Sequence, residues 1–329
     1  MRFIVLGAGA IGGVVGGRLA QHGHDVVLIA RGAHYEAIRD HGLRIESPDE
    51  TATVQLPVVD SPASITWSSD DVLLLATKTQ DTETALDRLA QSAPRTLPIL
   101  CAQNGVANER MAADRFANVY GVFVWCPADY LTPGTVQVWS APTSGILHIG
   151  CYPSGSDPTA ESVAGAFRDS TFLADAKPDI MRWKYRKLLS NLGNAVDALC
   201  GTAARGSGLA QRARSEGVAC LAAAGISFIA DEEEDAGQLE RQVQPRTIGG
   251  AERRGGSSWQ SLARQLGTIE TDYLNGEIVR MGRDHGVQTP VNALLQYLSQ
   301  RVARERRPPG SVNPDKILIA LDLRQNPLE

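Results

Sequence analysis

A short glycine-rich motif near the start of the chain limits the fold more than any other feature. Residues 2–6 form an apolar run, and the next six residues read Gly7-Ala8-Gly9-Ala10-Ile11-Gly12. Apolar side chains at helical spacing follow, and a second apolar run covers 25–29. A strand, a GxGxxG turn, a helix and a second strand form the βαβ unit in which this motif binds a dinucleotide.

The three glycines have separate physical roles in such a turn. Gly7 permits the tight turn, Gly9 lets the backbone approach a pyrophosphate, and Gly12 allows close packing of the helix. The helix N-terminus then faces the negative charge. The motif, including Ala8, Ala10 and Ile11, is therefore a predicted cofactor-binding segment.

The end of the second strand indicates which dinucleotide is bound. Sites for NAD usually place Asp or Glu here to accept from the ribose hydroxyls, whereas this chain has Ala30-Arg31-Gly32. A guanidinium at Arg31 suits a 2′-phosphate, because it donates two parallel hydrogen bonds. The sequence therefore favours NADPH/NADP+.

Alternating strand and helix patterns continue through the first half of the chain. This alternation predicts an α/β fold with a doubly wound parallel sheet, a Rossmann domain over residues 1–178. A change to short strands with turn residues predicts an antiparallel annex at the sheet edge. The expected segments are strands at 72–75, 98–101 and 119–122, helices at 80–92 and 105–113, and annex strands at 133–138 and 145–149.

The second half has helical periodicity only. Residues 179–329 are therefore expected to form an all-helical substrate and catalytic domain with an extended C-terminal tail after Pro308-Pro309-Gly310. Its predicted helices cover 180–199, 208–230, 259–283 and 290–306, with a polar, glycine-rich interruption at 244–258.

Composition and charge exclude several classes of protein. The net charge of −5 gives no broad positive field for nucleic acid. No apolar run approaches the roughly 20 residues of a membrane helix, so a cytoplasmic location is expected. The five cysteines contain no CxxC pair and the six histidines no HxxxH pattern, so we expect neither a metal site nor a catalytic histidine.

Five sequence blocks in this order and spacing resemble the ketopantoate reductase family over nearly the whole chain. They are the glycine motif with Arg31, Thr77-Lys78-Thr79-Gln80, Gln103-Asn104-Gly105, Trp183 to Asn191, and Ser257-Ser258-Trp259 with Glu270 to Gly276. The resemblance implies NADPH-driven reduction of a 2-oxo acid, ketopantoate first, to the 2-hydroxy acid, a step of pantothenate biosynthesis. The cofactor supplies the hydride and the protein a proton.

The resemblance also implies roles for particular side chains. Lys187 occupies the position of the proton donor, and Glu270 that of a carboxylate that orients the lysine or accepts from substrate or cofactor hydroxyls. Ser258 corresponds to a contact of the substrate carboxylate. Asn104 corresponds to a residue that touches cofactor and substrate, and Lys78 to a cofactor contact.

Helical spacing adds two amides to this group. Asn191 and Asn194 follow Lys187 at i+4 and i+7 on the predicted helix over 180–199, so all three are expected on one face. An ammonium near a ketone oxygen stabilises the developing alkoxide and protonates it, while amides hold the substrate oxygens.

Three positions depart from the family pattern and keep alternatives open. Ala195 replaces a second asparagine, Arg205 falls at a further polar position, and Gly255 stands where an asparagine often precedes the serine pair. A relative acting on a different 2-oxo or 2-hydroxy acid is the alternative enzyme. A non-catalytic NADPH sensor is the alternative from another class, and a homodimer is a possible assembly.

Overall fold

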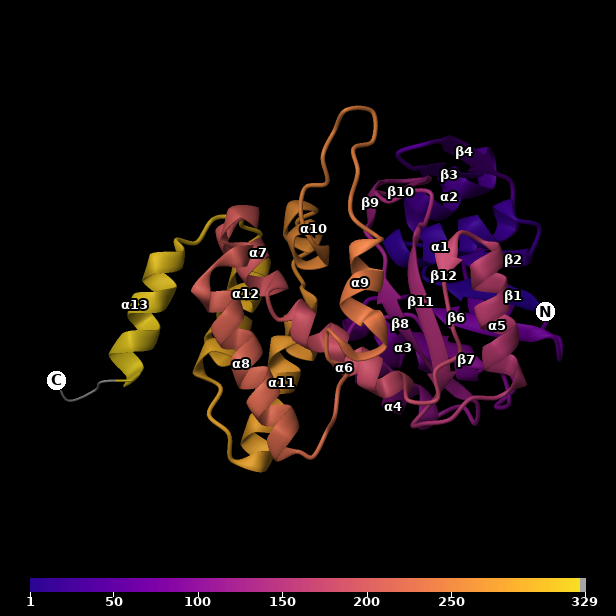
Figure 1. The fold of residues 1–329 in the computed structure, drawn as a ribbon. Coiled ribbons are helices and arrows are strands. Elements are labelled where there is room, and N and C mark those ends of the chain that lie inside the picture. The colour runs from indigo at the N-terminus through magenta and orange to yellow at the C-terminus, as the bar shows by residue number, and fades with distance from the viewer. Residues whose placement is uncertain (326–329) are drawn as a thin grey trace. The chain divides into compact units, whose positions relative to one another are not determined.

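The chain forms two compact units in a computed structural model (Figure 1). The structure describes residues 1–325, apart from the side chains of 205, 206, 234 and 323–325. The first unit comprises Met1–Lys184 and Ile229–Arg253, and the second Tyr185–Phe228 and Arg254–Glu329. The first is mixed α/β with a mostly parallel sheet and the second is helical, which confirms the predicted fold class.

The first unit is built on an eight-stranded sheet. In spatial order its strands are β12 (Phe172–Leu173), β11 (Gly145–Cys151), β8 (Val119–Trp125), β7 (Ile99–Cys101), β6 (Asp71–Leu75), β1 (Arg2–Leu6), β2 (Asp25–Ile29) and β5 (Val58–Val59). Neighbours pair in parallel except β8 and β11, which are antiparallel. The strands β1 and β6 are almost wholly buried, which explains their continuous apolar runs.

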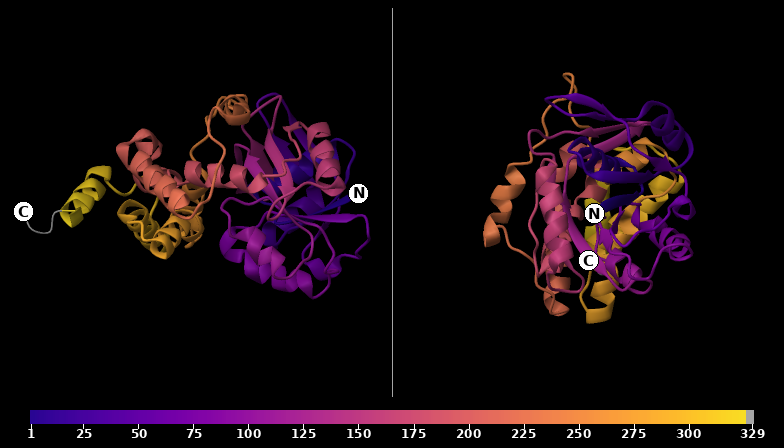
Figure 2. Two further views of the ribbon diagram at one scale, coloured as in Figure 1. Left: turned by 60° about the horizontal axis from the view of Figure 1, so that its bottom comes forward. Right: turned by 90° about the vertical axis from the view of Figure 1, so that its right-hand side faces the viewer.

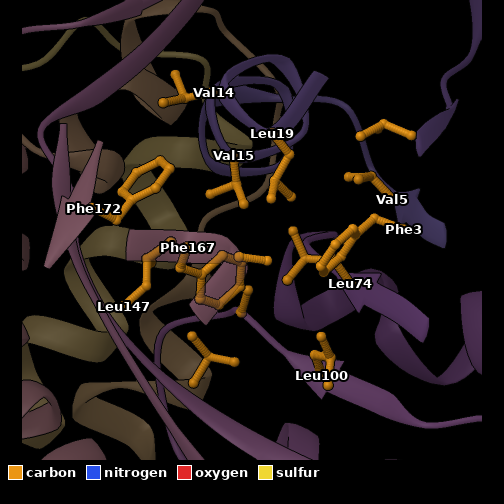
Figure 3. Close-up of a cluster of buried hydrophobic side chains, with 14 of the residues drawn as sticks. Phe3, Val5, Val14, Val15, Leu19, Leu74, Leu100, Leu147, Phe167 and Phe172 are labelled. Atoms are coloured by element: carbon orange, nitrogen blue, oxygen red, sulfur yellow. The ribbon is translucent and has the colours of Figure 1, made fainter. Parts of the chain in front are cut away.

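Alternate residues of these strands form a core under two helices. Phe3 and Val5 of β1 and Leu74 of β6 lie in one buried cluster with side chains of α1 (Ala10–Gln21) and α5 (Pro158–Asp169). Figure 3 shows Val14, Val15 and Leu19 of α1 and Phe167 of α5 in this cluster. The alternation follows from the two-residue period of a strand.

Helices on the opposite face complete the doubly wound arrangement. The helices α3 (Thr82–Ala90) and α4 (Asn108–Ala113) lie on that face (Figure 2), and they follow β6 and β7 respectively. Helix α2 (Gly32–His41) follows β2 and buries Ile38 in the core cluster. Each parallel crossover thus carries its own helix.

A second, smaller sheet corrects the predicted annex. It has the order β4 (Thr51–Val54), β3 (Leu43–Glu46), β10 (Thr135–Val138) and β9 (Ala128–Thr132). The strand expected at 133–138 belongs to it. The strand expected at 145–149 is antiparallel as predicted, since β11 pairs antiparallel with β8, but it lies in the main sheet and not in the smaller one. Residues 145–150 of β11 are buried on both faces, so the strand belongs inside the main sheet between β8 and β12.

The division into units differs from the boundary expected at residue 178. Helix α6 (Ile180–Asn191) begins within the first unit, where Ile180 and Trp183 join a buried cluster with Phe123 and Ile146. Three side chains from the segment 229–253, which includes α9 (Ala236–Arg241), complete the same cluster. Burial of this apolar face holds both segments in the first unit.

The second unit is helical, and the helical stretch expected over 259–283 is divided among three of its elements. Two further expectations are also corrected. Its elements are the end of α6, α7 (Asn194–Cys200), η3 (Thr202–Gly206), α8 (Gly208–Ala223), α10 (Ser257–Ala263), η5 (Glu270–Tyr273), α11 (Asn275–His285), α12 (Pro290–Arg304) and α13 (Pro314–Gln325). The single helix expected over 180–199 is wrong, because α6 ends at Asn191 and α7 begins at Asn194, after Gly193. In this break Asn275 Nδ2 donates to the carbonyl of Leu192 at 3.2 Å. The extended tail is wrong over α13, which buries Ile317 and Leu321 at i,i+4 spacing.

Candidate active site

The glycine loop between β1 and α1 has room on one side only. Gly7 has φ +102°, and a Cβ there would lie 2.9 Å from the carbonyl carbon of Ala76. A Cβ on Gly12 would lie 2.1 Å from the Gly7 carbonyl oxygen, whereas one on Gly9 meets nothing within 4 Å. No side chain caps the N-terminus of α1, and its first turn carries no acidic residue. The backbone N–H groups at the start of α1 therefore have no side-chain partner at the cap. Together with the open space over Gly9, they suit a diphosphate.

A buried histidine, His34, holds the backbone of the glycine loop through a hydrogen bond. The Nδ1 of His34 accepts from Gly134 N at 2.9 Å, so the proton of the neutral ring is on Nε2. The Nε2 then donates to the carbonyl of Ala8 at 2.7 Å. His34 lies in the first turn of α2, and it ties this helix to the glycine loop.

Arg31 lies where the chain leaves β2. It is the exposed residue before α2, and no ion pair involves it among the described side chains. The strand ends at buried Ile29 and is followed by buried Ala30, so no carboxylate stands at the position that would receive a ribose hydroxyl. A guanidinium is thus the charged group nearest in sequence to the end of β2.

Lys78 and Asn104 follow the neighbouring strands β6 and β7. Lys78 precedes η2 (Thr79–Asp81), and Asn104 precedes α4. The strand order β7-β6-β1-β2 places these residues, the glycine loop and Arg31 at the carboxyl ends of four adjacent strands. Ligands of doubly wound sheets bind at this edge.

In the second unit the predicted catalytic lysine is followed by a pair of amides. Lys187 is half-buried on α6, and Asn191 is its last residue. Asn194 begins α7, so the expectation that all three side chains share one helix face is wrong. The break still keeps the amides together, because Asn194 Nδ2 donates to Asn191 Oδ1 at 3.3 Å.

Ser258 and Glu270 are buried in the same unit. Ser258 is the second residue of α10, whose cap is Gly256, so the hydroxyl is not the helix cap. The N–H of Gly256 donates to Asp197 Oδ2 of α7 at 2.9 Å, which ties the start of α10 to α7. Glu270 opens η5, the turn before α11.

The structure explains one of the three departures directly. Gly255 has φ +127°, and a Cβ there would lie 2.7 Å from Cγ of Trp259, so an asparagine does not fit without a shift. Ala195 is a buried residue of α7, and nothing in the structure explains this departure. The side chain of Arg205 lies outside the described residues.

Burial shifts the pKa values of two cysteines and one histidine away from those of reactive groups. Burial raises the pKa of the Cys101 thiol, with a further contribution from Glu109, and raises that of Cys200 to about 11. Burial lowers the pKa of His148 to about 4, and its ring lies 4.7 Å from that of Trp183 in the core. Among the described residues we find no cluster suited to a metal ion, and no helix long and apolar enough to cross a membrane.

The sequence did not predict the buried polar network that joins the ends of β6 and β7. Its charged members are Lys184 of α6 and Glu109 of α4. Lysine in a helix is usually solvated, and the only local signal is the neighbouring Trp183, which is fully buried.

Comparison with known proteins places both halves of the chain in one family. The model for ketopantoate reductase PanE/ApbA matches residues 3–154, and the model for its C-terminal part matches residues 179–303. The 2-dehydropantoate 2-reductase of Pyrococcus horikoshii is 30% identical over 307 residues, which is 91% of this chain and 96% of the relative. That of Archaeoglobus fulgidus is 31% identical over 310 residues, covering 92% and 97%.

Solved structures give the same result. A PanE/ApbA family ketopantoate reductase from Ralstonia eutropha JMP134 has a TM-score of 0.77 at 27% identity, covering 93% of this chain and 99% of that one. D-mandelate dehydrogenase with NADH and anilino(oxo)acetate has a TM-score of 0.79 at 25% identity and the same coverage. The chain therefore belongs to the ketopantoate reductase family of oxidoreductases.

Proposed function

We propose that this protein uses NADPH to reduce a 2-oxo acid to the 2-hydroxy acid, with ketopantoate as the first candidate substrate. Membership of the family supports reduction of a 2-oxo acid with a nicotinamide dinucleotide. The observation that carries the proposal is the glycine loop, with free space over Gly9 and an uncapped helix start behind it. The finer assignments rest on particular side chains.

The residues of the first unit would hold the cofactor. The N–H groups at the start of α1 would bind the diphosphate, and Arg31 would bind the 2′-phosphate. Lys78 and Asn104 would contact the cofactor from the ends of β6 and β7. When bound, NADPH supplies the hydride.

The residues of the second unit would donate the proton and bind the substrate oxygens. Lys187 Nζ would stabilise the negative charge on the ketone oxygen and donate a proton to it. Asn191 and Asn194 would donate to the substrate oxygens, and Ser258 would bind the substrate carboxylate. Glu270 would orient Lys187 or accept from a hydroxyl of substrate or cofactor.

The substrate test is NADPH oxidation at 340 nm by the purified protein with a panel of 2-oxo acids. We expect ketopantoate to give the highest kcat/KM among branched and unbranched acids. A clear preference for another acid would contradict ketopantoate and leave the proposed reaction in place. NADPH binding without turnover of any acid would favour the sensor.

A second candidate substrate class follows from the altered substrate side. Gly255 and Ala195 remove two amides of the family pattern, and D-mandelate dehydrogenase is a structural neighbour. An acid with a larger apolar group fits a site with fewer donors. Phenylglyoxylate, the 2-oxo acid corresponding to mandelate, therefore belongs in the panel.

Replacing Arg31 by alanine is expected to lower the preference for NADPH over NADH by roughly 10- to 100-fold, because hydrogen bonds to a charged group contribute about 1.5–3 kcal/mol. The measurement is the Kd of each cofactor from fluorescence titration. Arg39→Ala is the matched control, since Arg39 is an exposed arginine on α2 that pairs with Asp40. An unchanged preference in Arg31→Ala would contradict the assignment.

A further inference from the structure

An ion pair buried in the first unit has no role in the function described so far. Lys184 Nζ of α6 lies 2.6 Å from Glu109 Oε1 of α4, and the two side chains are 2% and 0% exposed. Burying two charges removes their hydration, and apolar residues of similar volume often stabilise a protein as well or better. Stability alone is therefore a weak explanation for the pair.

The ammonium also fixes the chain at the point where it leaves β7. Lys184 Nζ donates to the carbonyl of Gln103 at 2.8 Å and lies 3.4 Å from that of Cys101. The ammonium thus pairs with one carboxylate and donates hydrogen bonds to two backbone carbonyls. The residue that follows Gln103 is Asn104, the proposed contact of cofactor and substrate.

The side chain of Gln103 extends the network to the next loop. Its Nε2 donates to the carbonyl of Thr77 at 3.0 Å and to Oγ1 of Thr82 at 2.7 Å. Thr77 directly precedes Lys78, the other proposed cofactor contact at this edge. Both loops are thus held by hydrogen bonds that converge on Gln103.

Asn108 fixes the Asn104 backbone from the other side. It is fully buried in α4, accepts from Thr82 Oγ1 at 2.9 Å and donates through Nδ2 to the carbonyl of Asn104 at 3.1 Å. Glu109 is the next residue of α4. Two buried side chains therefore fix the backbone around Asn104. Asn108 donates to the carbonyl of Asn104, and Lys184 donates to the carbonyl of Gln103.

We propose that Lys184 is a positioning residue that holds the loop of Asn104 in place for cofactor and substrate, with Glu109 neutralising its buried charge. Lys184 acts through the Gln103 carbonyl and does not itself touch the reacting atoms. The inference rests on the proposed function, because it assigns Asn104 to the site. It gives the buried pair a role that two apolar side chains cannot fill.

The test separates positioning from folding with a double variant. Lys184→Met leaves the Glu109 carboxylate buried without its partner, and we expect a Tm lower by roughly 10 °C. Lys184→Met with Glu109→Leu removes both charges and should restore most of the Tm. The double variant still lacks the donor to Gln103, so we expect kcat/KM to stay about tenfold or more below wild type and the Kd of NADPH to rise about tenfold.

Arg2→Met is the matched control for a lost buried partner. Arg2 Nε pairs with the buried Asp71 at 2.8 Å, at the amino ends of β1 and β6. This variant should lose stability while keeping kcat/KM and the Kd of NADPH. A double variant at Lys184 and Glu109 with wild-type kcat/KM and Kd would overturn the positioning role.

Turnover of the 2-oxo acids and the Kd of NADPH also distinguish failure of the positioning role from failure of the proposed function. If the wild-type protein binds NADPH and reduces none of the acids, the proposed reaction fails. The Kd of NADPH for the double variant against wild type then decides the role of Lys184. If the wild type reduces an acid and the double variant does so equally well, the reaction stands and the positioning role fails.

Discussion

Lys187→Ala is expected to lower kcat with the preferred 2-oxo acid by about a thousandfold while NADPH still binds with its wild-type Kd. General acid catalysis by a positioned side chain contributes typically 10²–10⁴-fold, and an ammonium near the developing alkoxide adds electrostatic stabilisation. Because the proposed cofactor contacts at the ends of β1, β2, β6 and β7 do not include Lys187, cofactor binding should be spared. The measurements are steady-state kinetics at 340 nm and a fluorescence titration.

Two further variants show what Lys187 contributes. Lys187→Arg keeps the positive charge but cannot release a proton near neutral pH, so substrate binding should survive better than kcat. Lys316→Ala removes an exposed lysine of α13 and should change nothing. A Lys187→Ala protein within tenfold of the wild-type kcat would exclude Lys187 as the proton donor.

Gly12→Ala is expected to abolish measurable NADPH binding and to destabilise the protein by about 3 kcal/mol, at the upper end of overpacking effects. The added Cβ would lie 2.1 Å from the Gly7 carbonyl oxygen, which is backbone and cannot rotate away. Helix α1 and the glycine loop would have to move apart. Thermal unfolding and NADPH titration measure the two effects.

Gly9→Ala is the matched variant for this prediction. A Cβ on Gly9 meets nothing within 4 Å of the protein, so the Tm should stay near wild type. The methyl group would occupy the space proposed for the pyrophosphate, so the Kd of NADPH should rise by at least tenfold. If Gly9→Ala bound NADPH normally, the cofactor would not lie over this loop.

The fold of the first unit was largely predictable because its signals are local. The glycine motif and the runs at 2–6 and 25–29 specify a βαβ unit within about 30 residues. The strands β3 and β10 were harder, since their pairing joins residues such as Arg44 and Thr135 across a long stretch of chain. Pattern in one strand does not reveal a partner so distant.

The places of the candidate site residues in the fold were predictable where a residue follows the end of a strand, and unpredictable where tertiary contacts decide. Arg31, Lys78 and Asn104 each follow a predicted strand, so their edge of the sheet could be inferred. The break between Asn191 and Asn194 was missed although Gly193 lies in it, and the hydrogen bond that Asn275 donates to the Leu192 carbonyl comes from far along the chain. The apolar stripe continues through the break and resembles one helix.

The boundaries of the first unit have a consequence for the order in which the protein is made. Ile229, Ala236 and Val243 close the cluster around Phe123 and Trp183, but they are separated from Lys184 by residues of the second unit. Domains generally fold from the N-terminus during synthesis, and the ribosome adds about 5–20 residues per second. We therefore expect the apolar face around Trp183 to stay exposed for several seconds of synthesis, until the segment from Ile229 to Val243 is made. An exposed apolar face of this kind is a binding site for chaperones.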